Sequence, residues 1–246
     1  MNKEEKIARK FLPLSAAQRG VWFAQQLVQE SPLYNTGAYL EIHGAIDPML
    51  FETVWRRIVA ETEALHVTFA NDSEVLQQIF DPSLDWPFPI IDLSAEADPR
   101  ATAEAWMWED LTQPVDLTQG PLFAHALFKI TPNCFFLYNR YHHIIMDRWG
   151  TGLLARRLAE DYSALTVGES PTSEPFGDLA LILQEEQAYR CSEQFAVDRD
   201  YWMKRLVDRP EPVSLAEGLA IASDRALTTD SASVLIHIRQ PTSPWT

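Results

Sequence analysis

The feature that most constrains the fold is a pair of apolar β-type segments between residues 121 and 143. LFAHALFKI and CFFLYNRYH are separated only by a polar turn at 131–133. Two such runs joined by a short connection predict an antiparallel hairpin. Helical patterns flank this hairpin, over 48–64, 99–112 and 154–165. Strands interleaved with helices predict an α+β fold, a two-layer sandwich in which helices pack on a mixed sheet.

Shorter patterns extend this prediction on both sides of the hairpin. Ser15 can cap the backbone amide of Gln18, whose side chain can reach back, so a helix is expected to begin there. Residues 37–44 alternate apolar and polar side chains, which predicts a half-buried strand. Further short strands are expected at LHVTF, EVLQQIF and PIIDL, and one long helix over 178–207. A Pro-rich linker then leads into a last alternating segment, SASVLIHIRQ.

The composition excludes several classes of partner. The chain has 246 residues and 46% hydrophobic content, which suits a globular protein. A net charge of −15 repels phosphate backbones, and no Lys/Arg cluster offers a nucleic-acid footprint, so we expect no nucleic-acid partner. No apolar run reaches the ~18 residues of a membrane span, so we expect no membrane segment. Cys134 and Cys191 are the two cysteines, expected to be thiols in a reducing cytoplasm.

Two adjacent histidines end the second segment of the hairpin, and they are the strongest candidates for chemistry. Consecutive side chains of a strand point to opposite faces, so His142 and His143 cannot both enter one cavity. One ring is therefore expected to be structural and the other catalytic or liganding. Neutral imidazole exchanges a proton near pH 7, and a nearby carboxylate can hold it in place.

Three interpretations of this pair remain open on the local sequence. Both rings can be hydrogen-bonded packing groups, as polar side chains at strand ends need partners. A metal site needs at least three convergent ligands, and apart from Asp147 no neighbouring residue offers one, so no metal is expected. One histidine can instead act as an acid, a base or a substrate-orienting group. A serine nucleophile is not expected, because the chain lacks a G-x-S-x-G elbow.

Four short motifs occur in a fixed order along the chain, LSAAQRGVW (14–22), ALHVTF (64–69), HHIIMDR (142–148) and PFGDLAL (175–181). They resemble, in the same order, motifs of the condensation domains of nonribosomal peptide synthetases, whose signature is HHxxxDG. Outside that signature the matching residues are Ser15, Ala17, Gln18, Trp22, Glu63, Leu65, Phe69, Asp178 and Ala180. YNRYHH, PIIDL and DPRATAEA further resemble the condensation domains of enterobactin-type siderophore synthetases.

This resemblance implies a chloramphenicol acetyltransferase-like lobe and an amide-forming reaction. In condensation domains the amino group of an aminoacyl thioester attacks an acyl or aryl thioester, and phosphopantetheine arms of carrier proteins present both substrates. The expected partners are an acyl or aryl carrier protein and a peptidyl carrier protein, with no cofactor held by the chain itself. By this match, His143 orients or deprotonates the attacking amine. His142 is structural, and Asp147 is an ion-pair former that shapes the loop.

Arg148 stands where the family has glycine. A glycine there either supplies a backbone conformation closed to other residues or leaves space for a ligand, and arginine does neither. Its side chain can pair with Asp147 or Glu109, obstruct the substrate tunnel or extend into solvent. We expect obstruction, and we expect Trp149 and Gly150 to line or obstruct the same tunnel.

The resemblance covers one of the two lobes of a condensation domain. It predicts a tail over 1–12, the first lobe over 13–181, a helix and linker over 182–222, and the start of a truncated second lobe over 223–246. The V-N-T, Q-D-Y-P-F-E and S-R-N-P-L motifs of the other lobe have no counterpart here. Two hypotheses follow: an enzyme lobe that a second polypeptide completes, or a non-catalytic remnant that at most binds a carrier protein.

Overall fold

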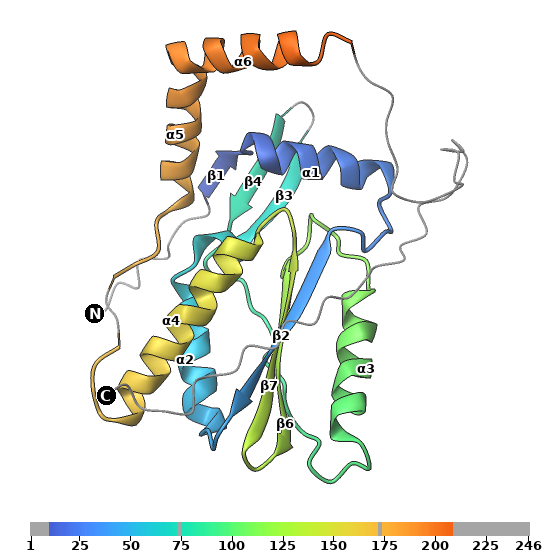
Figure 1. The fold of residues 1–246 in the computed structure, drawn as a ribbon, viewed down its shortest axis with the longest axis vertical. Helices are drawn as coiled ribbons and strands as arrows, with labels where there is room; N and C mark the ends of the chain where they lie inside the picture. Colours follow the sequence, from blue (N-terminus) through green and yellow to red (C-terminus); the bar gives the residue numbers. More distant parts are fainter. Residues whose placement is uncertain (1–9, 73–74, 172–173, 209–246) are drawn as a thin grey trace. The chain divides into compact units, whose positions relative to one another are not determined.

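The structure is a computed structural model that describes residues 10–72, 75–171 and 174–208 (Figure 1). The chain divides into two compact units, and among the described residues the first ends at Leu179 and the second begins at Ala180. The first unit contains both β-sheets, and the described part of the second is helical. In the described part of the chain no helix has the length and apolar content needed to cross a membrane.

A four-stranded sheet forms the centre of the first unit. Its strand order is β2 (Asn35–His43), β7 (Cys134–His142), β6 (Phe123–Thr131) and β5 (Ile90–Asp92). The pair β6 and β7 is the antiparallel hairpin that the sequence predicted. Because β5 runs parallel to β6 while the other pairs are antiparallel, the sheet is mixed, as expected.

A second, three-stranded antiparallel sheet has the order β1 (Lys10–Pro13), β4 (Val75–Phe80) and β3 (Val67–Asp72). The expected tail over 1–12 therefore overlaps a strand, since Lys10 pairs with Phe80 in the β1–β4 register. The Lys10 ammonium also lies 2.9 Å from Glu63 and 5.2 Å from the centre of the Phe80 ring. These contacts hold the start of the described chain against the lobe.

The helix starts follow their capping residues. At α1 (Ala16–Leu27) the Ser15 hydroxyl accepts from the Gln18 amide at 3.2 Å, and the Gln18 side chain accepts from the Ser15 amide at 2.9 Å. This is the reciprocal cap that the sequence predicted. Asp47 caps α2 (Pro48–Ala60). That helix is shorter than predicted, because Thr62 is extended and a 3₁₀ turn, η1 (Glu63–His66), follows.

Helices cover both faces of the four-stranded sheet (Figure 1). Helices α2 and α4 (Arg148–Thr166) pack on one face, and α3 (Pro99–Leu111) packs on the other. Leu137 belongs to the first core, whereas its neighbours Phe136 and Tyr138 belong to the second. Burial on both faces explains why β6 and β7 read as nearly continuous apolar runs instead of alternating ones. The α+β class is confirmed, with α3 covering the second face.

The second unit corrects one prediction and leaves others outside the described residues. The expected helix over 178–207 is two helices, α5 (Leu179–Arg190) and α6 (Glu193–Arg205). The break occurs because the Ser192 hydroxyl accepts from the Phe195 amide at 3.2 Å and starts a new helix. The predicted linker beyond residue 208 and the predicted start of a second lobe over 223–246 lie outside the described residues.

Candidate active site

The adjacent histidines lie where β7 ends and the chain turns toward α4. Strand β7 ends at His142, which pairs with Asn35 of β2, and residues 143–145 form a turn. The sequence predicted that the strand would continue through His143, so the turn, and not strand alternation, places that residue. The predicted separation of the two rings is nevertheless confirmed, since His142 is 2% exposed and His143 is exposed.

The buried ring of His142 is held in one neutral tautomer. Its Nδ1 accepts a hydrogen bond from the Ile144 amide at 3.2 Å, so in the neutral ring the proton is on Nε2. That Nε2 lies 3.4 Å from Oε1 of Gln25, to which it donates. Burial, together with the nearby charge of Arg140, lowers the pKa of His142 to about 4. His142 is therefore neutral at physiological pH.

Gln25 of α1 is the partner that orients this ring, and the sequence analysis missed it. Its side-chain nitrogen donates to the carbonyls of Val28, Gln29 and Ser31 at 3.0, 3.2 and 3.1 Å. Those bonds fix the amide so that its oxygen faces His142. Gln25 is 3% exposed and follows Val21 by four residues. This helical spacing from the apolar stripe of α1 is the signal that could have revealed it.

The exposed ring of His143 is held in the opposite tautomer. Its Nδ1 lies 2.9 Å from the carbonyl oxygen of Met146, and a carbonyl only accepts, so Nδ1 carries the proton. The backbone amide of His143 donates to the carbonyl of Tyr34 at 2.7 Å, which fixes the position of the turn. In the neutral ring Nε2 consequently carries a lone pair that can accept a proton or a hydrogen bond.

Asp147 begins α4 as its N-terminal cap. Its carboxylate accepts from the Gly150 amide at 2.8 Å, and its carbonyl accepts from the Thr151 amide at 3.0 Å and the Thr151 hydroxyl at 2.9 Å. In the part of the chain that the structure describes, no ion pair involves this carboxylate. Among the described residues Asp147 therefore acts as a helix cap that shapes the loop, and its role as an ion-pair former stays a prediction.

Arg148 and Trp149 form the exposed first turn of α4. Arg148 adopts helical backbone geometry, so this position does not need the conformational freedom of glycine. A glycine here could provide backbone freedom or space for a ligand. The helical backbone excludes the first reason and leaves the second. The Arg148 side chain is exposed, and within residues 10–72, 75–171 and 174–208 no ion pair to Asp147 or Glu109 is formed. Trp149 is 77% exposed.

Gly150 has a packing role that the structure makes visible. A Cβ at this position would collide with the sulfur of Met146, a residue that is 8% exposed. A side chain at position 150 would therefore force the buried Met146 side chain to shift. Because Met146 also provides the carbonyl that holds the His143 ring, Gly150 supports the position of His143.

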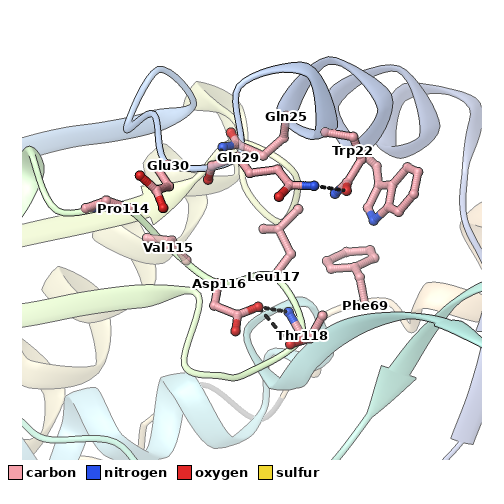
Figure 2. Close-up of a pocket in the computed structure, with 11 residues that line it drawn as sticks. Trp22, Gln25, Gln29, Glu30, Phe69, Pro114, Val115, Asp116, Leu117 and Thr118 are labelled. Carbon is pink, nitrogen blue, oxygen red and sulfur yellow. Dashed lines mark hydrogen bonds between the residues drawn. The ribbon is translucent and has the colours of Figure 1, made fainter.

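A cavity of about 590 Å³ lies beside Gln25, the residue that bonds the buried histidine (Figure 2). It lies between the C-terminal half of α1 and the segment 114–118, with Phe69 of β3 also in its wall. Gln25 lines this cavity and also bonds His142, so one amide joins the cavity wall to the histidine pair. Trp22, one of the motif residues, lies in the same wall.

Gln18, Glu63 and Phe176 of the motif segments bring distant parts of the chain together. Glu63 accepts from the Leu179 amide at 2.9 Å, which joins the second motif to the fourth. Gln18 donates to the buried side chain of Gln78 at 3.1 Å. Phe176 packs under the guanidinium of Arg157, whose carbon lies 4.7 Å from the ring centre. These motif residues therefore hold segments that are far apart in the sequence against one another.

Arg157 was also missed from the sequence. Its Nη2 donates to the Glu174 carbonyl at 2.6 Å, and its Nη1 lies 3.6 Å from Glu61. It is 9% exposed and follows Leu154 by three residues on the buried face of α4. A charged residue on an apolar helix face was the available signal.

The chain matches a known protein family and several curated proteins. The family model of the condensation domain matches residues 8–241. An isonitrile lipopeptide synthase from Streptomyces coeruleorubidus is 48% identical over 84% of this chain, which spans 14% of that protein. Enterobactin synthase component F from Escherichia coli O157:H7 is 34% identical over 83% of the chain, which spans 16% of it.

A solved structure shows the same likeness. The starter condensation domain of rhizomide synthetase RzmA, as a variant in complex with C8-CoA, matches with a TM-score of 0.81 and 43% identity. The match covers 86% of this chain and 49% of that domain's chain, so the chain spans about half the length of the solved domain. The motifs, the histidine turn and these matches show that the chain belongs to the condensation-domain family of nonribosomal peptide synthetases.

Proposed function

We propose that this chain supplies the histidine-bearing half of a condensation site that forms amide bonds between carrier-bound substrates. The observation that carries the proposal is His143, exposed in the turn after β7 with its Nδ1 proton held by the Met146 carbonyl. This leaves an imidazole nitrogen with a lone pair at the surface. Such a group suits an attacking amine, which has to lose a proton as it becomes an amide nitrogen.

In the proposed reaction, the amino group of an aminoacyl thioester attacks the carbonyl carbon of a donor thioester. A carbon–nitrogen bond forms, the carbon–sulfur bond breaks, and the donor arm leaves as a thiol. Nε2 of His143 orients the amine and accepts its proton, which then passes to the departing thiolate. His142 and Asp147 do not exchange protons in this proposal, because one ring is buried and neutral and the carboxylate caps α4.

The relatives favour an acyl donor over an aryl donor. The isonitrile lipopeptide synthase is 48% identical and the enterobactin component 34% identical. The RzmA domain was crystallised with C8-CoA. We therefore propose an acyl thioester on a carrier protein as donor and an aminoacyl thioester on a peptidyl carrier protein as acceptor. An aryl donor of the siderophore type is the competing outcome. Cys134 and Cys191 are free thiols, which supports a cytoplasmic setting within this proposal.

Amide formation requires both thioesters to be held in near-attack geometry, which is worth roughly 7–11 kcal/mol of the barrier. Since this chain spans about half of the solved domain it resembles, the proposal includes a complementary half, from the same longer protein or from a second polypeptide. The test therefore joins this chain to the second half of the RzmA starter domain. Product on the acceptor carrier protein is measured by intact-protein mass spectrometry with acyl and aryl donors in parallel.

The expected result is condensation with the acyl donor and a loss of about 10²–10⁴-fold in rate in His143→Ala, the range for a positioned acid–base group. Asn133→Ala is the control, because Asn133 is exposed in the turn between β6 and β7, at the opposite end of β7 from His143. Equal losses in both variants, or full activity in His143→Ala, would contradict the role of His143.

Arg148→Gly tests the proposed obstruction in the same joined domain. Because the backbone at this position is helical, we attribute the glycine of the family to the space that it leaves for substrate. Removing the Arg148 side chain is therefore expected to raise turnover. Arg148→Lys, which keeps the length and charge, is the control and is expected to stay low. If the arginine form already matches the glycine form, the side chain extends into solvent and does not block substrate. A folded joined domain that binds carrier proteins but is inactive in every variant would favour a binding module instead.

A further inference from the structure

Three metal-ligating side chains converge at the end of β2 and β7 that lies farthest from the histidine pair. Glu41 and His43 belong to β2, and Cys134 opens β7 directly opposite His43 in the register. Glu41 and His43 are two residues apart on one strand and therefore share a face. One potential ligand atom from each of the three residues lies within 4.8 Å of the other two. The proposed condensation chemistry makes no use of this cluster.

The distances approach those of a tetrahedral metal site. Nε2 of His43 lies 3.2 Å from Oε1 of Glu41, and Sγ of Cys134 lies 3.9 Å from the same oxygen. With zinc bonds of about 2.0–2.3 Å, tetrahedral geometry puts ligand atoms about 3.3–3.7 Å apart. Small side-chain rotations therefore suffice to close the site. The His43 side chain is 48% exposed, so a metal ion can reach the cluster from solvent.

Arg100 of α3 already holds the other oxygen of the carboxylate. Its Nη2 lies 2.9 Å from Oε2 of Glu41, and its guanidinium carbon lies 4.7 Å from the centre of the Phe136 ring. This leaves Oε1 turned toward His43 and Cys134. Ligating carboxylates are commonly held by such an outer hydrogen bond. The guanidinium weakens attraction for a cation, but once Cys134 has lost its thiol proton to the metal, the carboxylate, the thiolate and Arg100 together carry a charge of −1.

We propose that Glu41, His43 and Cys134 bind one borderline-soft divalent cation of the zinc class, with water in the fourth position. Thiolate and imidazole ligands select zinc-like metals over magnesium and calcium, which prefer oxygen ligands. Ligation uses the thiolate, so binding releases the proton of the Cys134 thiol to solvent. The metal would tie the first residue of β7 to the last residue of β2, the edge strand of the described sheet.

Cobalt(II) alone is the first probe, because a thiolate ligand gives a charge-transfer absorption that an oxygen or nitrogen ligand does not. The tag-free full chain is titrated with cobalt(II) and then with zinc(II) by competition. One equivalent with the charge-transfer band is expected for the wild type. Cys134→Ser is expected to abolish the band, and His43→Ala to weaken binding at least tenfold. Cys191→Ser is the matched control and is expected to bind as the wild type does.

Any of three results would overturn the proposal: a band that survives Cys134→Ser, a band lost in Cys191→Ser, or no stoichiometric binding by the wild type. Thermal unfolding of each variant in chelator separates a lost ligand from a lost fold, and Cys134→Ala provides a second variant if the serine form does not fold. Metal binding is measured directly, so the outcome is independent of whether the chain takes part in condensation.

Discussion

Replacing Gln25 with leucine tests how the buried histidine is held. In Gln25→Leu the Nε2 proton of His142 loses its acceptor at a site that is 2% exposed. A buried donor left without a partner costs about 1–3 kcal/mol. The carbonyls after α1 also lose their amide donor, at about 1 kcal/mol net. We therefore expect a loss of about 2–4 kcal/mol in the free energy of unfolding.

The measurement is denaturant unfolding at pH 7.5, followed by tryptophan fluorescence and extrapolated to water. Gln29→Leu is the control, because Gln29 is exposed and its side-chain nitrogen donates to the neighbouring Gln26 at 3.1 Å. Its unfolding free energy is expected to stay within about 0.5 kcal/mol of the wild type. A Gln25→Leu variant no less stable than this control would refute the argument.

A double-mutant cycle isolates the pair itself. In Gln25→Leu combined with His142→Phe, the unsatisfied donor is gone, so the double variant is expected to lose less stability than the two single changes added together. Groups in direct contact commonly couple by about 0.5–3 kcal/mol. Strictly additive losses would mean that the 3.4 Å contact between Gln25 and His142 contributes nothing.

Three further predictions follow from burial and packing. Burial lowers the pKa of His125 to about 3 and that of His142 to about 4 from a reference of 6.5, so both stay neutral in the fold while the unfolded chain protonates. Stability is expected to fall by up to about 2.7 kcal/mol per pH unit between pH 6 and 4 from these two groups, and His142→Gln is expected to remove about half of that slope in pH-dependent denaturation. Gly150→Ala is expected to destabilise the fold by about 1–3 kcal/mol, because the added Cβ collides with the Met146 sulfur. Thermal unfolding measures the loss, and Gly152→Ala is the control, since a Cβ at that position contacts no other residue. Phe23 and Leu27 are 61% and 85% exposed on α1, so the isolated chain is expected to bind a hydrophobic dye and to self-associate in light scattering; a monodisperse monomer without dye binding would contradict this.

Much of the fold could be read from local patterns, because local chemistry decides those features. The reciprocal cap between Ser15 and Gln18 depends on residues three apart, and it is present as predicted. The β6–β7 hairpin follows from two apolar runs and a short turn. The predicted helix over 178–207 failed because a cap at Ser192 outweighs the continuous helical pattern around it. Helix propensity is a weak preference, and a single side-chain hydrogen bond can end it.

By itself, the sequence determined the candidate site: the His142–His143 pair, the carboxylate of Asp147 and the unusual Arg148 are contiguous, so their order needed no fold. Only the tertiary structure decided which partners they have. Gln25 lies 117 positions from His142 and meets it because α1 packs beside the end of β7. Glu41 and Cys134 lie 93 positions apart and meet because β2 pairs with β7 in one register. Hydrogen bonds and metal ligation act over a few ångströms, and strand pairing and helix packing, not spacing along the chain, set which side chains come within that reach.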